Sequence, residues 1–261
     1  METKLTTNIV KLPKVPESDH SSSDALRLAE RWRSFRLHAL ITAPEAFAAS
    51  YEMESQQGIE KMVERMSNPK ATHFVAVSIA NPEHDTGSTS EKVVAIDTPW
   101  VGTIVLLGPL TEESSTRITA KKDPWTKVAA SDHVAGIEAS TIQVGEGGQK
   151  TFDSMHFHLN GMFVDTQARG QGLGLALIQA ALAEATQLSQ AGDCESLKAT
   201  ILVDAYNTAA RRLYQKAGFG IVGEEVYQQQ PRALVVGEEA RMKRVALLME
   251  HVRILSHETS A

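Results

Sequence analysis

The feature that most constrains the fold is a run of closely spaced glycines between an expected strand and a long expected helix. In GMFVDTQARGQGLGLALIQAALAEA, residues 161–185, Gly170, Gly172 and Gly174 stand at alternate positions directly before an apolar-striped helical pattern. Glycine loses more backbone entropy on folding than any other residue. A run of glycines therefore indicates that the backbone at these positions must be free of side chains. Because the first N–H groups of a helix have no partners within it, the order strand, glycine turn, helix predicts an anion-binding turn.

Spacing separates three kinds of phosphate-binding turn. A Walker loop would end in Gly-Lys-Ser/Thr, which is absent here, and the GxGxxG fingerprint fails because Leu175 or Leu177 takes the place of its third glycine. An Arg-x-x-Gly-x-Gly turn fits, with Arg169, Gly172 and Gly174. The N–H groups of such a turn, the helix dipole and the arginine charge would bind a diphosphate. The alternative is that the glycines only permit a sharp strand-to-helix turn.

Hydrophobic periodicity predicts the other elements. Expected strands are residues 72–80, 100–110, 156–164, 196–205, 219–227 and 243–252, with a weak edge strand at 8–15. Expected helices run from an N-cap at Ser23 or Asp24 to Pro44, from Ile59 to Pro69, and over 172–189 and 207–218. This order predicts a mixed α/β sheet with crossover connections. We expect one domain over residues 1–261, with polar inserts at about 81–99 and 111–153.

Composition and charge exclude several classes of function. The formal net charge is -6 and no long run of Lys or Arg occurs, so a nucleic-acid partner is not expected. No stretch of about 18 apolar residues occurs, so no membrane span is expected either. The first thirty residues lack a signal-peptide pattern and Cys194 is the only cysteine, which together predict a cytoplasmic protein. His156 and His158 share a strand without a third ligand nearby, so we expect no metal site.

Three segments in order resemble the GNAT superfamily of acyl-CoA-dependent N-acyltransferases. They are LNGMFVDTQARGQGLGLALIQAAL, LKATILVDAYN and TAARRLYQKAGF, and the resemblance covers residues 159–222 but neither polar insert. It implies a GNAT-like α/β (α+β) fold, in which a mixed, mostly antiparallel central sheet is splayed at the cofactor-binding strand and flanked by helices. It also implies acetyl-CoA as the acyl-donor cosubstrate and a monomer or homodimer.

The resemblance also implies the cofactor contacts. Gly161 would form a bulge in the strand, which is a common role for a glycine inside a strand. The resemblance assigns the pantetheine amides to the backbone of Met162, Phe163 and Val164. It assigns the diphosphate to the N–H groups of the turn, which comprises Arg169, Gly170, Gln171, Gly172, Leu173 and Gly174. Asn207 matches an asparagine that bonds the cofactor arm, and its alternative role is the N-cap of the following helix.

Two catalytic candidates follow from the resemblance. Tyr214 matches a tyrosine that reaches the cofactor sulfur, where a phenol of pKa about 10 can protonate a leaving thiolate of pKa about 8.5; its alternative role is core packing. The attacking amine must be neutral, so a base is expected, and some members of the family place a histidine or glutamate on this strand. His158 is the candidate base, unless it only packs against or bonds a neighbouring strand. Backbone N–H at Met162 or Phe163 could polarise the thioester carbonyl.

We therefore expect an N-acetyltransferase that transfers acetyl from acetyl-CoA to a primary amine of a small molecule by direct attack in a ternary complex. One alternative is a protein lysine or N-terminal acetyltransferase, because an acidic chain suits basic tails. A second alternative is a non-catalytic acyl-CoA-binding sensor, because no glutamate base stands on the strand that carries His158.

Overall fold

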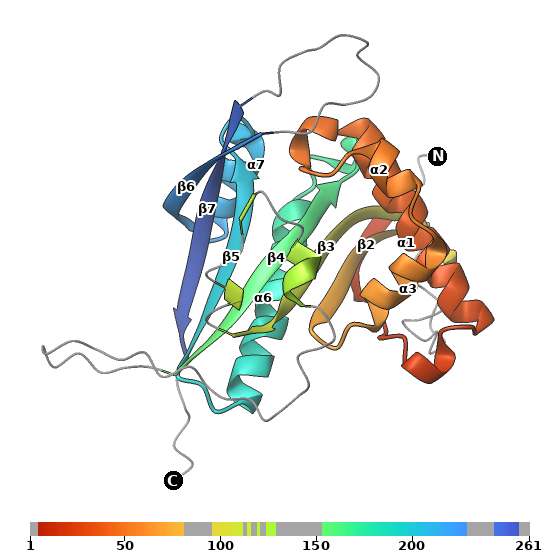
Figure 1. Ribbon diagram of the computed structural model, residues 1–261, viewed down its shortest axis with the longest axis horizontal. Helices are drawn as coiled ribbons and strands as arrows, with labels where there is room; N and C mark the ends of the chain where they lie inside the picture. The colour runs from red at the N-terminus through yellow and green to blue at the C-terminus, as the bar shows by residue number, and fades with distance from the viewer. Residues whose placement is uncertain are drawn as a thin grey trace, which may run out of the picture.

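The architecture is one mixed sheet covered by helices. The computed structural model describes residues 5–80, 96–111, 114–115, 119–120, 124–128, 153–228 and 243–255. The described strands form a seven-stranded sheet in the order β1-β2-β3-β4-β5-β7-β6 (Figure 1). They are β1 (Leu5–Lys11), β2 (Ala71–Ala80), β3 (Trp100–Leu110), β4 (Ser154–Val164), β5 (Ser196–Asp204), β6 (Gly220–Gln228) and β7 (Lys243–Ile254). All neighbouring pairs are antiparallel except β4 and β5, which are parallel.

Helices lie on both faces of this sheet (Figure 1). One face carries α1 (Ser23–Thr42), α2 (Tyr51–Ser55) and α3 (Ile59–Ser67), and the other carries α6 (Leu173–Ala191) and α7 (Thr208–Lys216). Short 3-10 turns are η1 (Glu17–Asp19), η2 (Pro44–Ala46), η4 (Pro124–Lys127) and η5 (Thr166–Ala168). Leu177 and Ile178 of α6 join Phe157 in one buried cluster, while Leu28 of α1 joins Val75 in another. Each face of the sheet therefore has its own apolar core.

Capping and proline set the helix ends. The Ser22 hydroxyl accepts a hydrogen bond from Ala25 N–H at 3.2 Å and caps α1. The predicted cap at Ser23 or Asp24 was therefore wrong by one residue, because consecutive serines offer equivalent hydroxyls and only one has the extended backbone of a cap. The predicted helix stops before Pro44 and Pro69 are confirmed, since α1 ends at residue 42 and α3 at residue 67.

The sheet opens between β4 and β5. Their ladder ends at the Leu159–Ile201 pair, although β4 continues to residue 164 and β5 to residue 204. Gly161 has φ 62°, and β4 carries one more residue than β3 between Asn160 and Phe163, which is a β-bulge. The predicted bulge and the splayed, mostly antiparallel sheet are therefore confirmed.

The remaining predicted strands and helices are also found, with ends shifted by a few residues. The weak strand predicted at 8–15 is β1, which lies at the edge of the sheet. The predicted inserts at 81–99 and 111–153 lie largely outside the described residues. In the part of the chain that the structure describes, no helix has the length and apolar character needed to cross a membrane.

Candidate active site

The three glycines of the β4–α6 turn meet two different requirements. Gly170 and Gly172 have φ 81° and 80°, in the left-handed region, although a Cβ at either position would meet nothing within 4 Å. Gly174 is set by packing instead, because a Cβ there would lie 2.8 Å from Leu213 Cδ2 of α7. The glycines are thus required for the path of the backbone. The open space beside Gly170 and Gly172 leaves room for a ligand.

The start of α6 has the properties of an anion site. The N-cap residue is Gly172, which has no side chain to cap the first N–H groups of α6. The first intrahelical bond of this turn runs from Ala176 N–H to Gly172 O at 3.1 Å, so the N–H groups before it have no partner within the helix. Arg169 is held beside them, because its Nε donates to Val164 O at 3.1 Å and its guanidinium lies 6.0 Å from the Phe163 ring centroid. The dipole of α6, its free N–H groups and the Arg169 guanidinium would together favour a bound anion.

A cavity of about 410 Å³ lies where the sheet is splayed. Its floor is formed by residues 158–162 of β4 and 201–204 of β5. Tyr214 of α7 lines it from one face of the sheet, whereas Phe35 and Arg36 of α1 and Phe47 line it from the other. The cavity therefore connects the two faces through the gap between β4 and β5.

Tyr214 is held in the core and also lines this cavity. It is 5 % exposed and its ring centroid lies 6.3 Å from that of Phe219. Burial raises the pKa of the Tyr214 phenol above its ordinary value, so the hydroxyl keeps its proton at neutral and moderately alkaline pH. A protonated phenol at this position can donate a hydrogen bond toward the cavity.

His158 lies on the cavity wall and bonds the neighbouring strand, as one of the two predicted roles requires. Its Nδ1 lies 3.0 Å from Thr200 Oγ1, and Thr200 donates its own proton to Phe157 O at 3.2 Å. Because that hydroxyl has only one proton, it accepts from His158 Nδ1–H, which leaves the lone pair on Nε2. Burial lowers the pKa of His158 to about 4, so the ring is neutral at pH 7. The imidazole is therefore a weak base, and it stays unprotonated and able to accept a proton at any pH well above 4.

Two buried histidines should make the protein less stable in mild acid. Burial lowers the pKa values of His158 and His73 to about 4, whereas the unfolded chain takes up these protons near pH 6.5. The unfolded state therefore binds more protons between pH 6.5 and 4, and each histidine removes about 2 kcal/mol of unfolding free energy between pH 7 and pH 5. Urea unfolding at the two pH values measures the loss. His158→Gln should show a shallower pH dependence than the wild-type chain, and equal slopes would contradict the assignment.

The remaining predicted residues lie in β4, in the β4–α6 turn or at the start of α7. Val164 pairs with Gly102 of β3, and the Phe163 ring packs 5.7 Å from that of Phe35. Gln171 is exposed in the turn, and Leu173 is buried at the start of α6. Asn207 Oδ1 accepts from Ala210 N–H at 3.0 Å, so its alternative role as the N-cap of α7 is present. The Met162 side chain faces α6, since its Cε lies 3.2 Å from where a Cβ on Gly174 would be.

Two charged clusters on the cavity wall were missed by sequence reasoning. Asp204, at the end of β5, lies 2.6 Å from Arg244 Nε through its Oδ2, which also accepts from the Tyr227 hydroxyl at 3.0 Å. Glu54 of α2 pairs with Arg36 of α1. An aspartate that ends an apolar strand was a usable signal for the first cluster, whereas the second depends on how α2 packs on α1.

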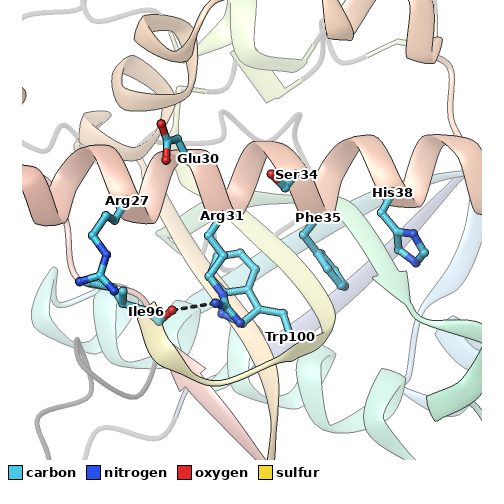
Figure 2. A pocket seen from close by; sticks show the side chains of 8 residues that line it. All are labelled: Arg27, Glu30, Arg31, Ser34, Phe35, His38, Ile96 and Trp100. Carbon is cyan, nitrogen blue, oxygen red and sulfur yellow. Dashed lines mark hydrogen bonds between the residues drawn. The ribbon is translucent and has the colours of Figure 1, made fainter.

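A separate groove of about 550 Å³ follows the outer side of α1 (Figure 2). Arg27, Arg31 and His38 line it along one side of the helix, and Arg31 Nη1 donates to Ile96 O at 2.7 Å. The groove contains none of the predicted site residues. Its connection to the turn is His38, whose Nε2 donates to Asp165 Oδ2 at 2.6 Å directly after β4. This bond ties α1 to the start of the β4–α6 turn.

The described residues offer no obvious metal centre. Within these ranges, no three His, Cys, Asp or Glu side chains are grouped to hold a metal ion.

Comparison with known proteins gives a family match over part of the chain. Residues 128–221 match the family model described as acetyltransferase (GNAT) domain. A sequence search of curated proteins returns no match. Similar solved structures include Arabidopsis thaliana NAA60 in complex with a bisubstrate analogue, at 13% identity and TM-score 0.49, covering 95% of this chain and 98% of that one. Vibrio cholerae spermidine N-acetyltransferase in complex with CoA and spermine has 12% identity and TM-score 0.43, covering 96% of each chain.

The family match covers the elements around the β4–α6 turn. It includes β4 with its bulge, the glycine turn, α6, β5 and α7, which are also the elements that line the splay of the sheet. The sequence motifs, the splayed mixed sheet and the family model agree on one assignment. Residues 128–221 therefore match an acetyltransferase (GNAT) domain, a match that supports an acyl-CoA-dependent acetyltransferase.

Proposed function

We propose that the protein transfers acetyl from acetyl-CoA to a primary amine of a small molecule, by direct attack in a ternary complex. The observation that carries this proposal is the cavity that crosses the sheet at the splay. A cofactor arm lying along β4 and an acceptor entering from the α1 face would meet in this gap. Neither substrate would have to leave before the other binds.

The residues of the β4–α6 segment fit the cofactor. Acetyl-CoA supplies the acetyl thioester. The turn residues 169–174 would bind its diphosphate, because their space is open and the N-terminus of α6 lacks a capping side chain in the described structure. Residues 162–164 of β4 lie beyond the end of the β4–β5 ladder, so their backbone can bond the pantetheine amides as an added strand would.

The two catalytic candidates line the same cavity from opposite sides of the sheet. His158 lies on the α1 face, where its Nε2 lone pair can take a proton from the amine directly or through a water molecule. As the amine nitrogen bonds the acetyl carbon, the carbon–sulfur bond breaks. Tyr214 then gives its proton to the departing sulfur and recovers one from solvent. One proton leaves the amine and one reaches the thiol, so the step balances.

Two measurements test this function. Calorimetry should show that the purified chain binds acetyl-CoA, and CoA release should appear with small primary amines from a broad panel. Basic peptides with free lysine or N-terminal amines form the second arm of the assay. Turnover of peptides alone would favour a protein acceptor. Tight acetyl-CoA binding with no turnover of any amine would favour a sensor, and absence of acetyl-CoA binding would overturn both.

A further inference from the structure

The acceptor side of the cavity carries a rigidly held arginine. Arg36 Nε and Nη2 bond the two carboxylate oxygens of Glu54 at 3.1 and 2.9 Å. The same guanidinium lies 4.4 Å from the ring centroid of Phe47. The side chains of Arg36 and Glu54 are only 17% and 8% exposed, so this pair is largely shielded from water. A bidentate, stacked arginine in such a site has a fixed orientation.

Three polar atoms on the cavity wall have unused hydrogen-bonding capacity. Among the described residues, Arg36 Nη1, Thr103 Oγ1 and Gln57 Oε1 are buried without a hydrogen-bond partner. All three residues line the cavity. Thr103 is only 4% exposed, so its hydroxyl has little access to bulk water. Because an unsatisfied buried polar atom is costly, such a set at one cavity indicates a ligand that supplies the missing partners.

These atoms lie on the face of the sheet that α1 covers. Thr103 is the direct partner of Phe163 across the β3–β4 ladder, and paired residues of antiparallel strands point to the same face. The Phe163 ring packs against Phe35 of α1 and against Phe47. Thr103 therefore points toward α1, which is the helix that carries Arg36. This is the side from which the acceptor, rather than the cofactor, would approach the splay.

We propose that Arg36 Nη1 and Thr103 Oγ1 donate hydrogen bonds to an uncharged carbonyl oxygen of the amine acceptor. The preferred acceptor is then an amino-amide or a related carbonyl compound rather than a plain alkylamine or an amino acid with a free carboxylate. This inference rests on the proposed transfer of acetyl to an amine, and it names the chemical class of the acceptor. Two donors match the two lone pairs of one carbonyl oxygen.

The charges of the cavity favour a neutral oxygen over a carboxylate. The Glu54 carboxylate already compensates the Arg36 guanidinium, and Asp204 on the same wall is compensated by Arg244 at 2.6 Å. A second carboxylate at Arg36 would be placed beside Glu54 in a poorly solvated site, where like charges repel strongly. Arg65, which also lines the cavity, is stacked 5.2 Å from the Trp125 ring centroid. The free Nη1–H of Arg36 therefore belongs to a guanidinium whose charge is already balanced by Glu54, so a neutral oxygen suits it better than a carboxylate.

A series of acceptors that differ only in this oxygen tests the inference. The compounds are ω-amino amides of increasing chain length, the matching ω-amino acids, and alkylamines without oxygen. Values of kcat/KM are divided by the fraction of neutral amine, since the three groups have different amine pKa values. We expect the best amide to exceed its amino acid and its alkylamine by about tenfold or more, the effect of one good hydrogen bond to a charged group. A wild-type enzyme that uses all three equally would overturn the inference.

Variants assign the effect to the named atoms. Arg36→Lys keeps the charge beside Glu54 but loses the planar, bidentate guanidinium, so kcat/KM should fall about tenfold more for the amide than for the alkylamine. Arg33→Lys is the matched control, because Arg33 ties the same segment through Ser55 O and Gln57 O but does not line the cavity. Arg33→Lys should affect both acceptors equally. Equal losses for both acceptors in Arg36→Lys would overturn the inference.

Thr103→Val separates binding from folding. The change removes a buried hydroxyl without a partner and keeps the side-chain shape, so the Tm should stay the same or rise. We expect a roughly fivefold lower kcat/KM for the amide alone. An unchanged amide preference in a folded Thr103→Val protein would remove Thr103 from the proposed contact. A chain that binds acetyl-CoA but acetylates no amine would instead refute the proposed function.

Discussion

Gly172→Asp should weaken acetyl-CoA binding at least about 100-fold while the protein stays folded. The substitution places a carboxylate at the N-cap of α6, where the cofactor diphosphate is proposed to lie. Repulsion between this charge and a doubly charged ligand about 5 Å away amounts to about 3 kcal/mol in a partly solvated site, which corresponds to about 100-fold. The new Cβ meets nothing within 4 Å, and φ 80° adds only about 1 to 2 kcal/mol of strain.

Gly172→Asn is the control, because asparagine has the same shape as aspartate and the same backbone strain but no charge. Calorimetric titration with acetyl-CoA gives the two Kd values, and thermal unfolding without ligand gives the stabilities. We expect similar Tm values for the two variants and a large difference in Kd. If both variants lose affinity equally, the glycine serves only the chain path and the diphosphate is bound elsewhere.

Elements with strong local signals were predictable from the sequence. β3 has its predicted bounds because its apolar residues are buried on both faces and the strand is bounded by polar segments. α6 was predictable because its apolar stripe continues without a proline from Leu173 to Ala191. The bulge at Gly161 followed from one glycine within a strand pattern. In each case the information lies within a few neighbouring residues.

Features that depend on tertiary packing were not predictable. Arg36 stands in a helix rich in charged residues, where arginine usually faces solvent, and nothing near it in sequence indicates that Glu54 folds back onto it. Thr103 was one β-branched residue in a strand, and its unpartnered hydroxyl appears only when β4 bulges away beside it. The acceptor side of the site is built by such long-range pairs, whereas the cofactor side is built by contiguous segments.

The ambiguity of His158 has the same origin. Its strand position was readable, but its partner Thr200 comes from β5, more than forty residues later. The bond to Thr200 fixes the tautomer, and burial sets the low pKa. Both of the predicted roles are therefore compatible: the ring bonds a neighbouring strand through Nδ1 and keeps Nε2 for a proton. In the proposed mechanism, the strand contact and the proton transfer would use different nitrogens of this one side chain.

Tyr214→Phe should lower kcat about 100-fold and change the Kd for acetyl-CoA by less than about twofold, the pattern expected when a general acid is removed. Tyr214 is 5% exposed and packs beside Phe219, and phenylalanine keeps this packing. Because burial raises the pKa of the phenol, the wild-type rate should also show no loss from Tyr214 ionisation as the pH rises through 9. Steady-state kinetics across pH and calorimetry with acetyl-CoA measure both quantities.

Tyr227→Phe is the matched control for this prediction, since Tyr227 is another buried tyrosine on the same cavity wall. Its hydroxyl already donates to Asp204 Oδ2 at 3.0 Å, so it is engaged in holding the Asp204–Arg244 pair rather than facing a leaving group. Its removal should lower stability by about 1 kcal/mol and leave kcat within about threefold. Comparable losses of kcat in the two variants, or a parallel loss of cofactor affinity in Tyr214→Phe, would mean that Tyr214 supports the cavity instead of protonating the thiolate.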